Sequence, residues 1–269
     1  MENLPLLDDK YALSADQIHL FQKNGSILLR EVLHQNEVAV YRQAILNAVQ
    51  RLNQETRPLA ERDTYGKAFL QIMNIWEVDE AVKKLVFSSR LAKIAAQLLG
   101  VEKVRLYHDQ ALFKEPGGGI TPWHQDQYYW PLDTDKTVTI WMPLVDTSVD
   151  MGMLTFAEES QNEGFLGNLA ISDNSEAVLT KVVQDKGYPI FRPDYMRAGD
   201  ATFHVGWALH SAPGNNSATM REIMTIIYFA DGAHVTKPVN QNQEADRQRW
   251  LNGINPGLLA NGPLNPVLG

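Results

Sequence analysis

The chain has 269 residues, of which 44% are hydrophobic and 21% charged, as in an ordinary globular protein that buries a substantial core. It contains no cysteine, which excludes disulfides, thiolate metal sites and cysteine nucleophiles. The formal net charge of −8 disfavours a nucleic-acid or anionic-membrane surface.

No apolar run approaches the ~20 residues of a membrane span. The N-terminal residues lack the basic start and the long apolar stretch of a signal peptide. We therefore expect a cytoplasmic protein of enzyme size, a monomer or homodimer, with no nucleic-acid or membrane partner.

The first third of the chain predicts helices. Ser14 is a suitable cap for a short helix through Phe21, and Gly25 allows a turn after it. From about residue 36, apolar residues recur at helical spacing through Leu52. A second amphipathic stretch begins at Ser88 or Ser89 and stops at Gly100, a residue type common just after helices.

After Gly100 the pattern changes to that of β-strands. Segments 101–114, 137–144, 153–156, 201–205 and 222–229 are short, rich in β-branched and aromatic residues, and separated by turn signals. Such a series predicts a sandwich or barrel. With the helices before it, we expect one domain that is mainly β with a helical cover, an α+β arrangement.

Two segments carry little periodicity. Residues 158–196 are long and polar, as in lids and binding loops, and we expect a lid-like insert there. Residues 236–269 hold several Asn, Gly and Pro and are expected to form a tail lying mostly on the surface. The predicted layout is a helical lead-in over about 12–100, a β core over about 101–235 with this insert, and the tail.

The first motif with chemical meaning is His124-Gln125-Asp126. A histidine and a carboxylate two residues apart lie on the same face of a strand, so both can reach one metal ion. They are two of the three ligands in a 2-His-1-carboxylate iron site. The triplet alone is a weak signal, and its meaning depends on a second histidine further along the chain.

The segment 198–215 supplies two candidates for that histidine, His204 and His210. Arg221 follows at the start of the next predicted strand, on the same face as Ile223, Thr225 and Ile227. An arginine at the head of an apolar inward row needs an anionic partner, because an unpaired buried charge is very costly. Its guanidinium is well suited to a carboxylate.

Together these residues resemble the phytanoyl-CoA dioxygenase family of Fe(II)- and 2-oxoglutarate-dependent oxygenases. The resemblance covers roughly residues 12–235. It is carried, in the order of the family, by the following elements: Phe113-Lys-Glu-Pro-Gly, Pro122-Trp-His-Gln-Asp, Trp141, Gly152-x-Leu154, Gly199-Asp-x-x-Phe-His, His210 and Arg221.

The resemblance implies a double-stranded β-helix, the cupin-like jelly-roll, with iron at one open end. It makes His124, Asp126 and His210 the iron ligands and His204 a non-ligand. Arg221 matches the arginine that holds the distal carboxylate of the cosubstrate.

Other positions match the cosubstrate pocket, namely Gln110, Gln125, Trp141 and, more loosely, Gln71. One departure is Ala212, where relatives often have a serine that contacts 2-oxoglutarate.

The implied activity is oxidation of a C–H bond in a small molecule, using Fe(II), 2-oxoglutarate and O₂ and releasing succinate and CO₂. Asp126 favours hydroxylation over halogenation, because halogenating relatives have a small residue there. Epimerisation, desaturation or ring closure with the same cofactors remains an alternative outcome. A non-catalytic jelly-roll that binds a metal or ligand is the alternative from another class.

Substrate contacts are predicted only loosely. Tyr128, Tyr129 and Trp130 follow the metal triplet and would form either an aromatic substrate wall or ordinary packing under the insert. His108 lies near Gln110 on the same predicted strand and would face either the pocket or the core.

Overall fold

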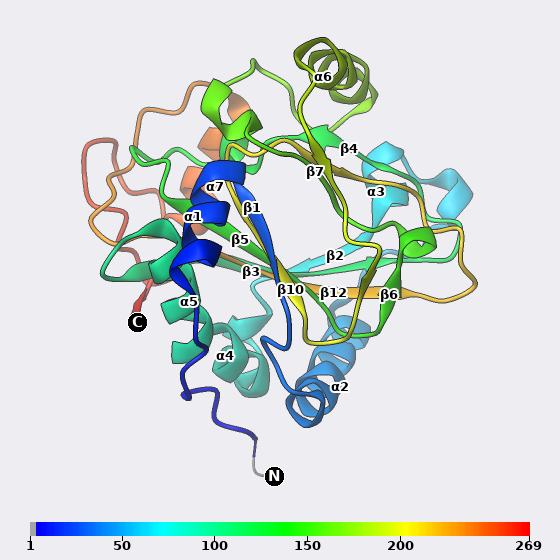
Figure 1. Ribbon diagram of the computed structural model, residues 1–269, viewed down its shortest axis with the longest axis horizontal. Coiled ribbons are helices and arrows are strands. Elements are labelled where there is room, and N and C mark those ends of the chain that lie inside the picture. Colours follow the sequence, from blue (N-terminus) through cyan, green and yellow to red (C-terminus); the bar gives the residue numbers. More distant parts are fainter. Residues whose placement is uncertain (1–3) are drawn as a thin grey trace.

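The computed structural model describes residues 4–269 and consists of two facing β-sheets with helices packed on the outside (Figure 1). The helices of the lead-in are α1 (Ala15–Asn24), α2 (Gln35–Leu52), α3 (Thr64–Ala68), α4 (Glu80–Val86) and α5 (Ser89–Leu99). Later in the chain come α6 (Asp173–Lys186) and α7 (Gln241–Trp250). Within the described range, no helix combines the length and apolarity needed to cross a bilayer.

The larger sheet has seven strands and carries most of the core. Its order is β1 (Ser26–Leu29), β10 (Ala201–Val205), β5 (Thr137–Pro143), β12 (Arg221–Ala230), β3 (Val104–Lys114) and β13 (Val267–Leu268), with β2 (Leu70–Met73) also paired to β3. Every pairing is antiparallel, and Thr225 of β12 lies between Gln110 of β3 and Trp141 of β5. The row from Arg221 to Ile227 therefore runs along the middle of the sheet.

The smaller sheet has four strands in the order β4 (Thr121–His124), β11 (His210–Ala212), β7 (Thr155–Ala157) and β8 (Ile190–Phe191). A third pair joins β6 (Thr147–Ser148) to β9 (Tyr195–Met196). Between the two main sheets lies an apolar cluster that includes Trp141, Leu154, Phe156 and Ile223. Two antiparallel sheets enclosing a core are the arrangement of a jelly-roll, as expected from the sequence.

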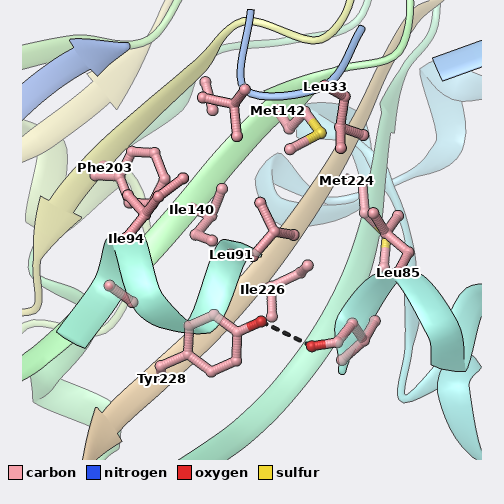
Figure 2. Packing of buried hydrophobic residues seen from close by; sticks show 14 of the residues in the cluster. Leu33, Leu85, Leu91, Ile94, Ile140, Met142, Phe203, Met224, Ile226 and Tyr228 are labelled. Atoms are coloured by element: carbon pink, nitrogen blue, oxygen red, sulfur yellow. Dashed lines mark hydrogen bonds between the residues drawn. The ribbon is translucent and has the colours of Figure 1, made fainter. Parts of the chain in front are cut away.

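The outer face of the larger sheet packs against the lead-in helices. Its central strands carry apolar side chains on both faces, so the face turned away from the smaller sheet must also be covered. Figure 2 shows Leu91 and Ile94 of α5 against Ile140, Phe203 and Ile226 of the sheet. The same figure shows the buried hydroxyl of Tyr228, which donates to the carbonyl of Val86 at 2.7 Å. Helix α5 begins at its cap Ser88 and ends at Gly100, whose φ of 67° is the left-handed conformation that glycine adopts without strain.

Leu91→Ala is expected to lower the free energy of unfolding by about 2–5 kcal/mol, because Leu91 is fully buried and the cavity left behind cannot collapse completely. Equilibrium denaturation in urea measures this loss. Lys93→Ala on the exposed side of the same helix is the control, with an expected change within about 0.5 kcal/mol. Equal effects from the two changes would contradict the packing described here.

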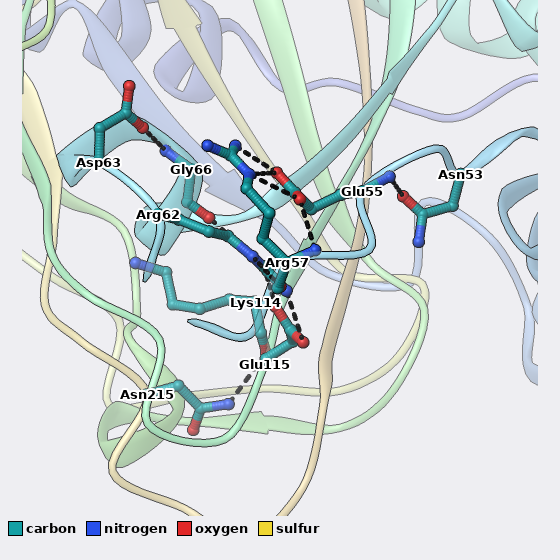
Figure 3. Close-up of polar contacts among 9 residues, drawn as sticks. All are labelled: Asn53, Glu55, Arg57, Arg62, Asp63, Gly66, Lys114, Glu115 and Asn215. Carbon is teal, nitrogen blue, oxygen red and sulfur yellow. Dashed lines mark hydrogen bonds and ion pairs between the residues drawn. The ribbon is translucent and has the colours of Figure 1, made fainter. Parts of the chain in front are cut away.

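The segment before α3 is tied to the loop after β3 by a buried arginine. Figure 3 shows Arg62 paired with Glu115, while its Nε donates to the carbonyl of Arg57 at 3.0 Å. Asn215, from the loop before β12, donates to the carbonyl of Lys114 at 3.0 Å. The Arg62–Glu115 pair therefore holds the segment before α3 against the loop after β3, while β2 is held by its pairing with β3.

Two segments with little sequence periodicity contain helices that the pattern did not predict. The insert 158–196 contains α6, which lies on the outside of the smaller sheet (Figure 1), where Glu176 accepts from the backbone N–H of Trp123 at 2.8 Å. Its periodicity is faint because only Ser175 and Leu179 are buried in this largely polar helix. The tail also returns to the core, since α7 ends at the buried Trp250 and is followed by the buried Leu251. The sequence pattern also left α4 and β2 unpredicted.

Candidate active site

The first two candidate ligands lie where β4 ends. His124 is the last residue of the strand, and Asp126 begins a short 3₁₀ turn, so the pair does not share one strand as expected. Gln125 between them is nevertheless extended, with φ −121° and ψ 124°. The alternation of side chains therefore continues for two residues, and His124 and Asp126 still face the same way.

His210 completes the set from the neighbouring strand. It is the first residue of β11, and it pairs directly with His124 across the sheet. The Nε2 atoms of His124 and His210 each lie 3.6 Å from Oδ1 of Asp126. One ligand atom from each of the three residues falls within 4.8 Å of the others, a spacing that suits a single ion.

The state of the two rings also fits a metal. Nδ1 of His124 lies 2.7 Å from the carbonyl of Pro122, and Nδ1 of His210 lies 3.0 Å from that of Ala208. A backbone carbonyl can only accept, so Nδ1 carries the proton and Nε2 keeps its lone pair for a ligand bond. Burial lowers the pKa of His124 to about 3 and that of His210 to about 4, which keeps both rings neutral at pH 7.

Asp126 is held as a carboxylate. Burial would raise its pKa, but the polar groups around it, among them the hydrogen bond with His204, keep the pKa below the usual range. Two neutral imidazoles and one carboxylate are the donor set of a 2-His-1-carboxylate iron site. The residues present therefore fit the metal that the sequence predicts.

His204 lies on the other side of Asp126. Its Nε2 is 3.3 Å from Oδ2, whereas His124 and His210 both contact the other carboxylate oxygen, Oδ1. Thr139 of β5 donates to the same Oδ2 at 2.8 Å. The geometry thus favours His210 as the ligand and makes His204 and Thr139 the groups that orient the carboxylate.

Thr139→Val is expected to weaken Fe(II) binding by about 10- to 100-fold, the usual effect of losing a group that orients a ligand. Anaerobic calorimetric titration with Fe(II) measures it. Thr202→Val is a matched control, because the buried Thr202 hydroxyl on neighbouring β10 has no hydrogen-bond partner within residues 4–269. Unchanged affinity in Thr139→Val would show that the hydroxyl does not position Asp126.

Arg221 lies deeper between the sheets and is 2% exposed. One guanidinium nitrogen donates to the carbonyl of Gly152, and the group lies 5.4 Å from the centre of the Trp141 ring. Among residues 4–269 no carboxylate lies within ion-pair distance of it, and its Nε has no hydrogen-bond partner. Burial lowers its pKa to about 9, so the group is still a cation at pH 7.

Position 152, beside Arg221, requires a glycine both for its backbone conformation and for lack of space. Its φ is 85°, and a Cβ there would stand 2.5 Å from the carbonyl oxygen of Pro213 and 3.3 Å from a guanidinium nitrogen of Arg221. Lys114, by contrast, is already satisfied, since its Nζ donates to Gly119, Thr121 and Pro213 oxygens, and burial lowers its pKa to about 6. Of these two buried basic groups, only Arg221 is left to receive an anion.

A cavity of about 460 Å³ joins the candidate ligands to Arg221. Most of the predicted pocket residues line it, namely Gln71, Gln110, Trp141, Tyr129, Trp130 and His108. Gln71 also donates to Gln110, and the phenol of Tyr65 donates to Gln71 at 2.8 Å. His204 and Ala212 belong to the lining as well.

Two predicted pocket residues point elsewhere. The Gln125 amide donates to the carbonyls of Gly164 and Trp207, both at 2.8 Å, because alternation turns it away from its two neighbours. The Tyr128 hydroxyl bonds with Asn168 at 3.1 Å and Asn242 at 3.0 Å, so it joins the insert to α7. Neither side chain is among those that line the cavity, which favours packing over a substrate contact for Tyr128 and leaves the cosubstrate role of Gln125 a prediction.

Sequence reasoning missed the wall that α7 gives to the cavity. Asn242, Ala245, Asp246, Arg249 and Trp250 line it, as do Ala170 and Ile171 of the insert. The apolar periodicity of α7 is negligible, so that pattern carried no signal. Its end signals were present, however: the cap Asn240, Glu244 in the first turn, and Arg247 and Arg249 in the last.

The chain is similar to a known protein family and to several characterised proteins. The family model of phytanoyl-CoA dioxygenase matches residues 21–223. A probable alpha-ketoglutarate-dependent hypophosphite dioxygenase of Stutzerimonas stutzeri is 24% identical over 157 residues, which is 57% of this chain and 54% of that protein. An ectoine dioxygenase of Bordetella parapertussis is 31% identical over 128 residues, 45% of this chain and 40% of that protein. The matched part thus spans about half the length of these curated relatives.

Among solved structures, the non-heme alpha ketoglutarate dependent carbocyclase SnoK from nogalamycin biosynthesis has the same fold. It superposes with a TM-score of 0.78 over 96% of this chain and 97% of its own, at 23% identity.

Proposed function

The chain belongs to the phytanoyl-CoA dioxygenase family, and from that premise we propose that it is an Fe(II)- and 2-oxoglutarate-dependent dioxygenase that oxidises a C–H bond of a small molecule. The observation that carries the proposal is the pairing of two features in one cavity. One is the set His124, Asp126 and His210, and the other is the buried Arg221 without a carboxylate partner among the described residues.

In this proposal His124, Asp126 and His210 hold Fe(II). The carbonyls of Pro122 and Ala208 fix the orientation of the two rings, and Thr139 and His204 fix that of the carboxylate. When bound, iron and 2-oxoglutarate would supply the oxidation of the substrate by O₂, with release of succinate and CO₂.

Arg221 holds the distal carboxylate of 2-oxoglutarate. A cation this deeply buried costs free energy unless an anion joins it, and the cosubstrate brings that anion. The planar guanidinium can bind a carboxylate through two parallel N–H donors. Trp141 packs beside the guanidinium, and Leu112 and Leu154 make the adjoining wall apolar, which strengthens the charge pairing.

The substrate occupies the other end of the cavity. From Arg221 to Ile227, β12 spans roughly 20 Å, so the two ends of the inward row are well separated. The far end is closed by α7 and by Tyr129 and Trp130, which follow the ligand triplet. The aromatic residues there favour an apolar small molecule placed beside the iron ligands.

The test is a turnover assay on the full chain with Fe(II), 2-oxoglutarate and O₂. We expect succinate to form, slowly without substrate and faster with an accepted one, and the product to gain one oxygen atom if the outcome is hydroxylation. Under argon, Fe(II) with 2-oxoglutarate is expected to give a weak visible charge-transfer band. If neither the band nor succinate is seen, the proposal fails, and a non-catalytic ligand-binding jelly-roll becomes the better interpretation.

A further inference from the structure

The substrate end of the cavity contains two polar groups that the proposed chemistry does not use, Asp246 of α7 and His108 of β3. Apolar and aromatic residues such as Tyr129, Trp130, Ile227 and Trp250 form most of the rest of this end, and Asn242 and Arg249 of α7 also line it. Polar groups in an otherwise apolar pocket fix the orientation of a ligand and select its chemistry. The hydrogen-bonding capacity that Asp246 and His108 leave unused therefore indicates what the pocket binds.

Asp246 has only part of its hydrogen-bonding capacity satisfied. The Tyr107 hydroxyl donates to Oδ2 at 3.0 Å, and within residues 4–269 no basic side chain is at ion-pair distance from the carboxyl group. The nearest candidate, Arg249, has its guanidinium 4.3 Å from the centre of the Trp250 ring. A carboxylate can accept about four hydrogen bonds, so Asp246 keeps acceptor sites at the cavity.

Burial raises the pKa of Asp246 to about 7, because the hydrogen bond from Tyr107 and the charge of Arg249 only partly offset the loss of water around the carboxylate. A hydrogen-bond donor arriving from the cavity would supply that stabilisation.

His108 is the second, independent observation. It is 5% exposed and lines the cavity, and neither of its ring nitrogens has a hydrogen-bond partner among the described residues; Nδ1 is shielded from the cavity, which leaves Nε2 to meet a ligand. Its ring packs 5.2 Å from those of Tyr107 and Trp250, so it lies in the same corner as Asp246. Unpaired buried polar groups are rare, and those in a ligand cavity are commonly completed by the ligand.

We propose that Asp246 and His108 form a polar subsite that binds a hydrogen-bond donor, an amine or a hydroxyl, carried by an apolar ring-containing substrate. The inference rests on the proposed function, because it concerns the substrate of that same site. Asp246 accepts from the donor, and His108 makes the second hydrogen bond with the same polar group. The aromatic wall packs on the apolar body and so places a C–H bond toward His124, Asp126 and His210.

Three probes that share one ring system test the subsite: 2-naphthylmethylamine, 2-naphthylmethanol and 2-methylnaphthalene. Equilibrium dialysis against the full chain, with Fe(II) and 2-oxoglutarate under argon, measures their affinities. We expect at least one donor-bearing probe to bind about tenfold or more tightly than the hydrocarbon, the effect of one hydrogen bond to a charged group. Preference for the amine identifies a cationic donor, and preference for the alcohol identifies a neutral one.

The variants separate Asp246 from general effects on the pocket. Asp246→Leu should reduce the donor preference to less than about threefold while leaving the hydrocarbon affinity unchanged. Asp246→Asn keeps an acceptor but loses the charge, so it should weaken the amine and spare the alcohol. His108→Phe should weaken the favoured donor about two- to tenfold. Glu244→Gln is the matched control on α7, because Glu244 pairs with Arg247 and lies outside the cavity lining.

Equal binding of all three probes by the unaltered protein would overturn the inference, as would a donor preference that survives Asp246→Leu. The visible band with Fe(II) and 2-oxoglutarate is recorded for every variant. Its presence shows that the iron and cosubstrate sites are intact, so a failed subsite is distinguished from a failed proposal of function.

Discussion

Replacing His210 with alanine is expected to weaken Fe(II) binding by more than about 100-fold and to abolish succinate formation. Nε2 of His210 lies beside Oδ1 of Asp126, where it can bind the metal directly. Losing a group that only orients a ligand weakens metal binding by about 10- to 100-fold. Removal of a ligand should exceed that effect. Anaerobic calorimetry with Fe(II) and an assay of succinate measure the two effects.

His204→Ala is the informative comparison, since His204 contacts the other carboxylate oxygen of Asp126. Its loss should weaken the metal less than the loss of His210, because Asp126 keeps its hydrogen bond from Thr139. His234→Ala, at a half-buried histidine beside Asp133 and away from the cavity, should leave metal binding unchanged. If His204→Ala removed the metal and His210→Ala retained it, the ligand assignment would have to be reversed.

Arg221→Met is expected to raise the dissociation constant of 2-oxoglutarate on the order of 100-fold while changing Fe(II) affinity little. Losing one partner of a buried, hydrogen-bonded charge pair costs about 2–5 kcal/mol of binding free energy. Methionine has a similar length and no charge. Titration with 2-oxoglutarate under argon, followed by the visible band, measures the change.

The same variant should not lower the melting temperature of the protein without cosubstrate. Arg221 is a buried cation with no carboxylate partner in residues 4–269, so its removal takes away a cost of folding. The additional stability conferred by 2-oxoglutarate should disappear at the same time. Arg192→Met, at an exposed arginine, is the control. Equal loss of iron and 2-oxoglutarate binding would indicate misfolding rather than a lost carboxylate contact.

Local patterns were sufficient where an element carries its own signals. The cap Ser14 predicted α1, and the cap Ser88 with the apolar row after it predicted α5. Runs of β-branched residues predicted β5, β10 and β12. The order of the motifs also pointed to His124, Asp126, His210 and Arg221, which the structure brings into one cavity. In each case the residues that form the element or site are chemically distinctive at that position.

The remaining features depend on contacts between distant segments. Gln125 and Tyr128 stand beside the ligands in sequence, but alternation and the bonds to Gly164, Trp207 and Asn242 turn them away from the cavity. Asp246 and Trp250 lie more than a hundred residues from the triplet, on a helix whose polar sequence hides its packing.

The chemistry of the candidate site was therefore readable from composition and order, because metal ligands and a carboxylate-binding arginine are few and specific residue types. The surfaces that enclose the substrate could not be predicted in this way. Any polar helix or loop can supply such a wall, and burial of α7 and of the insert against the sheets comes from long-range packing that no short stretch of sequence encodes.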